Sequence, residues 1–209
     1  MDGSSDGFFI SGSWDKTARI WKNRNCVAVL KGHTDAVWSV LLLSNSSNKL
    51  KIATASADRS IRIWTIDLAT FLNEPLNVSS ADMVLTGHSD CVRSLAKVDD
   101  NHLLSASNDG GVRCWDIIAG DCVGEFYGHS NFVYDVACRP EHGIILSSGE
   151  DRSVRVWPLP QEWRTGLLIE CSQTIALPCQ SVWCLSILPN GDAVAGCRLL
   201  YILFYLYDN

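Results

Sequence analysis

Hydrophobic and polar residues alternate along this chain in short runs. The runs are rich in Val, Ile and aromatic residues, as in "AVWSVLLL", "KIATAS" and "IRIW", and turn residues separate them every eight to twelve positions. Alternation with a period of two is typical of half-buried strands. No stretch keeps a helical period over three turns, so the sequence predicts an all-β fold with no helix beyond a short turn.

One eleven-residue pattern returns four times, with a Ser or Thr, an Asp and a Trp at fixed offsets. Its copies are "SGSWDKTARIW" (11–21), "TASADRSIRIW" (54–64), "SASNDGGVRCW" (105–115) and "SSGEDRSVRVW" (147–157). Successive final Trp residues are 43, 51 and 42 positions apart, and a Gly-His pair precedes three of them. Self-similarity of this period indicates one supersecondary unit per repeat.

The order Gly-His, Asp, Trp within a period of about 42 residues resembles the WD-repeat β-propeller, in which each blade has four strands. The resemblance implies that Gly-His lies in the loop before the innermost strand of a blade. It places the Asp in the tight turn between the second and third strands, and the Trp at the end of the third. Each eleven-residue segment is then one β-hairpin, needed once per blade.

The repeated polar residues also resemble a catalytic triad, because they include a hydroxyl, a His and a carboxylate. A triad is needed once, whereas a packing device is needed in every blade, so we predict structural hydrogen-bonded sets and no catalytic residue. A buried His or Asp needs such partners, since an unpaired polar group costs about 1–3 kcal/mol. The predicted sets are His33, Thr54, Asp58 and Trp64; His88, Ser105, Asp109 and Trp115; and His129, Ser147, Asp151 and Trp157.

The repeat is interrupted in the middle and at both ends. Residues 66–81 lengthen the segment after Trp64, and we interpret them as a solvated loop, with a partner-binding arm as the alternative. The chain enters its first repeat at a second strand, and the fifth repeat lacks its Gly-His. We therefore predict an incomplete WD-repeat propeller over residues 1–197, with three nearly whole blades and a partial blade at each end.

An atypical apolar tail occupies residues 198–209, where an Asp turn and a Trp would be expected. We expect this tail to lie outside the native propeller, as a translated unspliced segment would. The alternative is a variant third strand of the fifth blade. Its apolar run, residues 199–207, is shorter than the ~18–20 residues that a membrane span needs.

Composition narrows the classes of partner. With 47% apolar and 19% charged residues the chain is typical of globular proteins. Its net charge of −6 lacks the broad basic footprint of a nucleic-acid-binding protein, so no nucleic acid partner is expected. No apolar run is long enough for a membrane span, so no membrane partner is expected either.

The nine Cys residues are an odd number, and none forms C-x-x-C. The sequence also begins without a signal-peptide pattern. We interpret the thiols as reduced and structural, in a cytoplasmic and nuclear protein, with a zinc or disulfide framework as the alternative. His102 and His142 stand beside turn-like segments without a ligand-spaced partner, so we predict surface turn residues, no metal site and no cofactor.

The detail of the repeats resembles one family in particular. "SGSWDKTARIW", "GHTDAVWSV", "YGHSNFVYDV" and, most specifically, "TIALPCQSVWCLSILPNGD" are similar to the N-terminal propeller of the phospholipase A-2-activating protein family, over residues 7–197. The resemblance implies a non-enzymatic ubiquitin-binding propeller that acts in ubiquitin turnover and proteasomal degradation with an AAA-type segregase. It implies that later domains, which this sequence does not contain, contact the segregase. A generic WD-repeat scaffold that assembles another complex is the alternative.

Candidate ubiquitin-binding residues follow from the loops that this fold gathers on one face. Positions that flank the Val of each innermost strand, or that precede the turn Asp, are expected to be exposed, Ala36, Cys91 and Ser181 among them. Ubiquitin presents an apolar patch ringed by basic residues, which aromatic side chains and carboxylates would complement; packing between blades is the alternative for each aromatic. The candidates are Trp14, Trp38, Arg93, Asn108, Phe132, Tyr134, Glu150 and Trp183.

Overall fold

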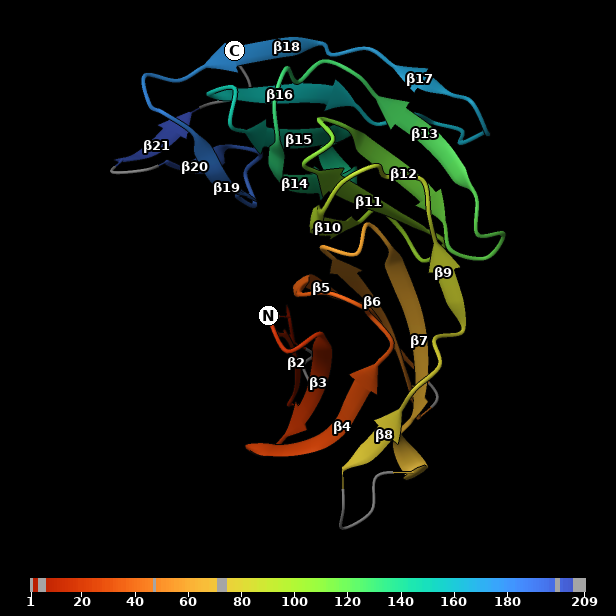
Figure 1. Cartoon of the computed structure of the whole chain (residues 1–209). Coiled ribbons are helices and arrows are strands. Elements are labelled where there is room, and N and C mark those ends of the chain that lie inside the picture. Colours follow the sequence, from red (N-terminus) through yellow and green to blue (C-terminus); the bar gives the residue numbers. More distant parts are fainter. Residues whose placement is uncertain (1, 4–6, 47, 71–74, 198–199, 205–209) are drawn as a thin grey trace. The chain divides into compact units, whose positions relative to one another are not determined.

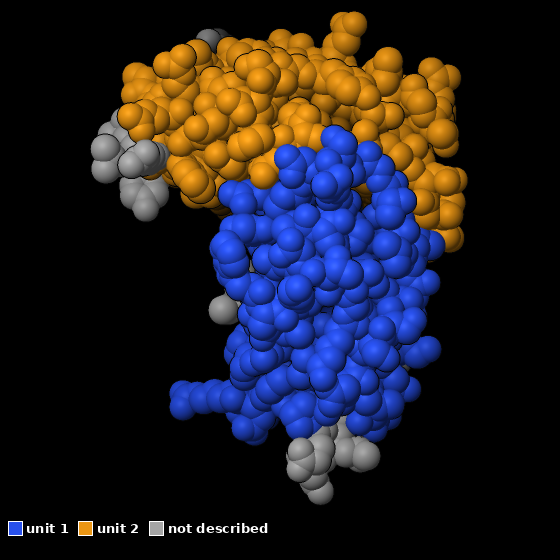
Figure 2. Space-filling view, in the orientation of Figure 1, with its two compact units in different colours: residues 1–95 blue, residues 96–209 orange. Residues whose placement is uncertain are grey.

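The computed structural model describes residues 2–3, 7–46, 48–70, 75–197 and 200–204. The chain forms two compact units, residues 1–95 and 96–209 (Figure 2). Across the described residues the secondary structure is β-strand with two short 3₁₀ helices and no α-helix (Figure 1). These helices are η1 (Leu68–Thr70) and η2 (Pro140–His142). The all-β prediction is confirmed.

The first sheet has the strand order β1-β2-β3-β4-β8. Phe8 and Ile10 of β2 are buried, as are Ala18 and Ile20 of β3, so alternate residues of these two strands face the core. The two-residue strand β1 pairs antiparallel with β2, which puts a short strand where none was expected. The strands are β1 (Asp2–Gly3), β2 (Phe8–Gly12), β3 (Thr17–Lys22), β4 (Asn25–Lys31) and β8 (Leu76–Val78).

The second sheet, with the order β5-β6-β7-β9, packs against the first. Side chains from both sheets form one buried cluster, which includes Ile10 and Ile20 of the first sheet and Ile52 and Trp64 of the second. Burial on both faces explains why the inner strands are so apolar. The strands are β5 (Val37–Ser46), β6 (Lys49–Ser56), β7 (Ile61–Asp67) and β9 (Met83–Leu85).

The third sheet has the order β10-β11-β12-β13-β17. Residues Leu103 to Ser107 of β11 are all buried, because this strand is covered on both faces. The sheet contributes Leu104, Val112 and Phe126 to the largest apolar cluster of the second unit. The strands are β10 (Val92–Lys97), β11 (His102–Ser107), β12 (Val112–Asp116), β13 (Cys122–Phe126) and β17 (Leu168–Ile169).

The fourth and fifth sheets complete the second unit, with the orders β14-β15-β16-β18 and β19-β20-β21. Val154 of the fourth sheet packs with Val182 and Ala195 of the fifth. The strands of the fourth sheet are β14 (Val133–Arg139), β15 (Ile144–Gly149), β16 (Ser153–Pro158) and β18 (Gln173–Ala176). Those of the fifth are β19 (Val182–Ile187), β20 (Ala193–Cys197) and β21 (Leu200–Phe204).

Two segments return to a sheet that the chain has already left. After β7, strand β8 pairs in parallel with β4 and forms the edge of the first sheet. After β16, strand β17 pairs in parallel with β13 of the third sheet. Leu76 and Val78 of β8 are partly buried against the first core cluster. The interpretation of residues 66–81 as a solvated loop is therefore wrong for β8, which completes a sheet.

The apolar tail is described only at residues 200–204; residues 198–199 and 205–209 lie outside the described residues. Strand β21 pairs antiparallel with β20, with Cys197 opposite Leu200 and Ala193 opposite Phe204. It therefore takes the place of a third strand in the fifth sheet. That residues 198–209 are foreign to the native propeller stays a prediction.

Candidate functional site

In the first unit, one predicted polar set is a continuous chain of hydrogen bonds. Asp58 Oδ2 lies 2.8 Å from His33 Nδ1, and His33 Nε2 lies 2.7 Å from Thr54 Oγ1. Trp64 Nε1 donates to the same Oγ1 over 2.9 Å. A carboxylate only accepts, so Nδ1 carries the proton, and the Nε2 of a neutral ring accepts from the Thr54 hydroxyl. Asp58 Oδ1 accepts from Ser60, so each polar side-chain atom of this hydrogen-bonded set has a partner.

The second unit repeats this chain with Ser in place of Thr. His129 Nδ1 lies 2.8 Å from Asp151 Oδ2, and His129 Nε2 lies 2.7 Å from Ser147 Oγ. Trp157 Nε1 donates to Ser147 Oγ over 2.8 Å. The His lies in the loop before the innermost strand, and the other groups lie on the hairpin that follows. Each set of hydrogen bonds therefore ties a Gly-His loop to the hairpin of its own sheet.

The remaining predicted set is divided between the two units. Trp115 Nε1 donates to Ser105 Oγ over 2.8 Å, and Asp109 Oδ1 accepts the backbone N–H of Gly111. Both Ser105 and Trp115 are buried in the second unit, and His88 is buried in the first. The positions and burial of these residues match those of the other two sets.

The carboxylates of the two complete chains are held ionised. Burial alone raises the pKa of Asp58, but hydrogen bonds from His33, Ser60 and the backbone N–H of Thr34 outweigh it and hold that pKa below its ordinary value. For Asp151, burial is likewise outweighed, by His129 and other donors, and its pKa is lowered too.

These chains are poorly placed for nucleophilic chemistry. The hydroxyl-bearing residues Thr54 and Ser147 are fully buried. Each hydroxyl oxygen already accepts a Trp N–H, so a substrate could not approach it. Their geometry is that of a structural clasp.

The candidate binding residues of the first unit form one aromatic cluster, which we call the Trp14–Trp38 cluster. The two indole rings meet edge to face, 5.2 Å between centroids. The guanidinium carbon of Arg93 lies 4.1 Å from the centroid of the Trp38 ring, a cation–π contact. Trp14 is 77% exposed and Trp38 38% exposed, so this cluster presents a large apolar surface beside one positive charge.

The candidates of the second unit form the Tyr134–Trp183 cluster. The rings of Tyr134 and Trp183 are stacked 4.7 Å apart, and Phe132 lies 6.5 Å from Tyr134. Tyr134 Oη donates to Glu150 Oε2 over 2.9 Å, which places a carboxylate at the cluster. Phe132 is 40% and Trp183 49% exposed, whereas Tyr134 and Glu150 are partly buried. Stacking and exposure thus occur together in these aromatics.

Adjacent innermost strands fix each cluster. The backbone N–H of Leu95 in β10 donates to Ser39 Oγ in β5, 3.2 Å away, next to Trp38 and Arg93. In the second unit a carboxylate replaces the Ser hydroxyl as the acceptor. The N–H of Leu185 in β19 donates to Asp135 Oδ2 in β14, 2.7 Å away. These strand-to-strand bonds hold the cluster residues side by side.

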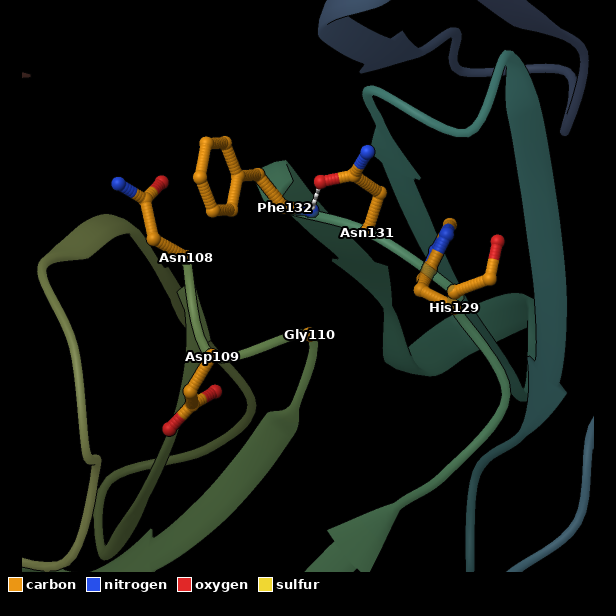
Figure 3. Close-up of a pocket in the computed structure, with 7 residues that line it drawn as sticks. Asn108, Asp109, Gly110, His129, Asn131 and Phe132 are labelled. Carbon is orange, nitrogen blue, oxygen red and sulfur yellow. Dashed lines mark hydrogen bonds between the residues drawn. The ribbon is translucent and has the colours of Figure 1, made fainter.

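The last candidate, Asn108, lines a hollow of about 280 Å³ together with Phe132. The hollow lies between the turn that joins β11 to β12 and the loop before β14 (Figure 3). The ring of Phe132 reaches toward Asn108, while the carboxylate of Asp109 points away from it (Figure 3). Sequence reasoning missed Gly110 and Asn131 in this lining. Comparing the four turns could have identified Gly110, because the other three have a basic residue there.

Three positions predicted to be exposed are buried: Ala36, Cys91 and Ser181. They precede the Val of an innermost strand and are covered by neighbouring loops; Ser56 Oγ, for example, donates to the carbonyl oxygen of Asp35 beside Ala36. His102 is also less exposed than predicted, since its ring bonds Asp99 and lies 5.9 Å from Trp163.

Within the described residues, no group of three or more His, Cys, Asp or Glu side chains is arranged to hold a metal ion. All nine cysteines are free thiols. No helix in the described part of the chain has the length and apolar character to cross a membrane.

Comparison with known proteins adds a family and several relatives. The model of the "WD domain, G-beta repeat" family matches residues 1–22, 24–65, 80–116 and 120–158. Over 237 residues the chain is 38% identical to the ubiquitin homeostasis protein lub1 of Schizosaccharomyces pombe, covering 100% of this chain and 31% of lub1. It is 31% identical to the ribosome biogenesis protein WDR12 homolog of Arabidopsis thaliana, covering 75% and 42%.

Among solved structures, the chain is similar to the crystal structure of the WD40 β-propeller domain of Doa1. The TM-score is 0.80 at 37% identity, and the match covers 96% of this chain and 60% of that one. The chain spans less than half the length of lub1 and of the WDR12 homolog.

Proposed function

Because this chain belongs to the WD domain, G-beta repeat family and contains part of a WD-repeat β-propeller, we propose that it is a non-enzymatic platform that binds ubiquitin. The role that we infer is in ubiquitin turnover and proteasome-dependent degradation, in the cytoplasm and nucleus. It needs no cofactor. Contact with the AAA segregase belongs, in this proposal, to domains other than the segment described here.

The observation that carries this proposal is the chemistry of the two aromatic clusters. Exposed Trp and Phe side chains, backed by Arg and Tyr, have the composition of interaction hot spots. An apolar surface with Glu150 at its side complements an apolar patch ringed by basic residues, which is what ubiquitin presents. The similarity of the whole chain to a ubiquitin homeostasis protein supports the same partner.

Titration of isotope-labelled ubiquitin with this chain tests the proposal. We expect saturable amide shifts confined to one apolar face of ubiquitin. Replacing both Trp38 and Tyr134 by Ala should weaken binding by more than about tenfold, because one residue of each cluster is removed. Tyr127→Ala, an exposed ring outside both clusters, is the control and should leave the affinity unchanged. Absent shifts, with the chain folded by its own dispersed spectrum, would refute the proposal.

The similarity to a ribosome biogenesis protein favours a second candidate, a WD-repeat scaffold that assembles another protein complex. Propellers are platforms with unrelated partners, so the fold alone does not separate the two candidates. This scaffold predicts no ubiquitin binding above background, while Trp38→Ala with Tyr134→Ala would still disrupt assembly with its own partner. The same titration therefore discriminates between them.

A further inference from the structure

The residue after the turn Asp adopts the left-handed conformation in four of the hairpins. Its φ is 72° at Lys16, 70° at Arg59, 65° at Arg152 and 85° at Gly110. This region disfavours residues with a Cβ, yet three turns nevertheless carry a long basic side chain, which is exposed. Of these four turns, the one between β11 and β12 alone has no side chain at this position.

Beside Gly110 lies the hollow of about 280 Å³ that Asn108 and Phe132 line. A Cβ built on Gly110 would lie 3.6 Å from the carbonyl oxygens of His129 and Asn131, which is ordinary contact. The site thus has room for a side chain, and two carbonyl oxygens border the place where it would start.

Three acceptor atoms border this hollow: Asn108 Oδ1 and the backbone carbonyl oxygens of His129 and Asn131. Asn108 Oδ1 is buried and, among the described residues, accepts no hydrogen bond. The ring of His129 is not available, since both its nitrogens bond Asp151 and Ser147. No Lys or Arg contributes to the lining, so an anion would find no positive charge there.

The face of Phe132 adds to this preference. Its ring is 40% exposed and reaches over the hollow toward Asn108 (Figure 3). The backbone N–H of Phe132 donates to Asn131 Oδ1 over 2.8 Å, which holds the backbone from which the ring extends. An aromatic face attracts a cation that lies over it, most strongly where water is excluded.

We propose that this hollow binds a Lys or Arg side chain of the protein partner. The incoming ammonium or guanidinium group donates to Asn108 Oδ1 and to the backbone carbonyls of His129 and Asn131, and lies against Phe132. The identity of the partner rests on the proposed function: the basic side chain is one of those that ring the apolar patch of ubiquitin.

Filling the hollow from within tests the inference. Gly110→Lys and the neutral Gly110→Met are compatible with the turn, because its three counterparts carry Lys or Arg at similar φ. Both should weaken ubiquitin binding about tenfold or more, measured by calorimetry on the full chain. Gly143→Lys is the matched control: that residue has φ 65°, open space around it and the same added charge, and it should bind as the wild type does.

A second variant removes the acceptor without filling the space. Asn108→Leu keeps the side-chain size and should also weaken binding about tenfold, since a hydrogen bond to a charged group is lost. Single Lys→Gln or Arg→Gln changes around the apolar patch of ubiquitin should then reveal one residue whose loss weakens binding to the wild type and has no added effect in Asn108→Leu.

The outcomes separate this inference from the proposed function. If ubiquitin binds the wild type, Gly110→Met and Asn108→Leu equally well, the inference is wrong and the proposed function stands. A loss with Gly110→Lys but not with Gly110→Met would reflect charge repulsion alone, and also overturns the inference. If ubiquitin does not bind the wild-type chain at all, both are overturned together.

Discussion

A single hydroxyl oxygen links three parts of each complete polar chain. Thr54 Oγ1 accepts the Trp64 N–H and donates to His33, which in turn donates to Asp58. The bonds run in one direction, so each donor is matched by one acceptor in a buried site. The sequence predicted these partners because Ser or Thr, Asp and Trp recur at fixed offsets. It could not reveal that one hydroxyl oxygen joins the Trp to the His.

Removing that hydroxyl should destabilise the fold strongly. Thr54→Val keeps the shape but leaves the Trp64 N–H and His33 Nε2 without a partner. We expect a loss of about 2–3 kcal/mol in the free energy of unfolding. Urea denaturation followed by Trp fluorescence measures it. Thr65→Val, at an exposed position of the neighbouring strand β7, is the control and should change stability by less than about 0.5 kcal/mol. Equal effects of the two changes would contradict the role assigned to Thr54.

The Asp of the chain makes stability depend on acid. The pKa of Asp58 is lowered in the folded state, so its stabilising contribution is complete above the unfolded pKa of about 3.9 and is lost as the pH falls below it. We expect wild type to be more stable than Asp58→Asn at pH 7, and this difference to shrink progressively from about pH 5 downward.

Urea midpoints at a series of pH values would measure that difference. The control is Asp121→Asn, at an exposed position, which should give a curve parallel to the wild type. A difference between wild type and Asp58→Asn that stays constant to pH 2 would show that the ionised carboxylate does not supply the stability.

At the scale of elements, the two returning strands are what sequence reasoning did not predict. Leu76 and Val78 are apolar residues in a polar surrounding, and nothing local shows that they pair with β4. Parallel pairing joins strands that are distant in sequence, so it depends on the path of the chain between them. The period of hydrophobic residues within a strand carries no information on that path. The hairpins were predictable for the opposite reason, because turn and strand residues are adjacent in sequence.

Trp163 anchors the second of these strands. Its ring lies against the backbone of Gly124, where a Cβ would come within 2.7 Å of Cζ3, and it packs 6.4 Å from Phe126. Trp163→Ala should cost about 2–3 kcal/mol, less than a fully buried Trp would, because the ring is partly exposed.

Hydrogen exchange gives a local measurement of the same change. The N–H of Glu125, which donates to the carbonyl oxygen of Leu167 over 2.9 Å, should lose protection in Trp163→Ala. Trp14→Ala, which removes an exposed Trp elsewhere, should leave that amide protected. Retained protection of Glu125 in Trp163→Ala would show that β17 is held without this anchor.

Considered as a whole molecule, the chain confirms the predicted fold class, an incomplete WD-repeat propeller of sheets that bury their apolar faces against one another. The aromatic candidates were recognisable because they precede or follow fixed motif residues. Ala36, Cys91 and Ser181 share those positions but are buried, since exposure depends on how neighbouring loops cover each position. A motif thus predicts the position of a residue in the repeat more reliably than its exposure to solvent.

The distribution of the thiols provides a test over both units. Cys184 is exposed, whereas Cys91 and Cys114 are buried. Burial raises the pKa of Cys91 to about 11 and that of Cys138 to about 12, and raises that of Cys114 as well. Thiolates are the reactive form, so brief alkylation at pH 8 should label Cys184 first and the other three only after unfolding. Mass spectrometry would read this out, and labelling of native Cys114 as fast as Cys184 would contradict the burial.

The returning strands also have a consequence for synthesis on the ribosome. While β4 emerges, its outer edge has no partner, and none exists until the chain has passed through three strands of the second sheet and reached β8. The edge of β13 waits in the same way for β17. An unpaired edge attracts other extended chains, so each nascent sheet passes through an interval in which it is open to misassembly. A later segment of the chain thus supplies the edge strand of an earlier sheet. A chain cut between two repeats would leave the sheet before the cut without its edge strand.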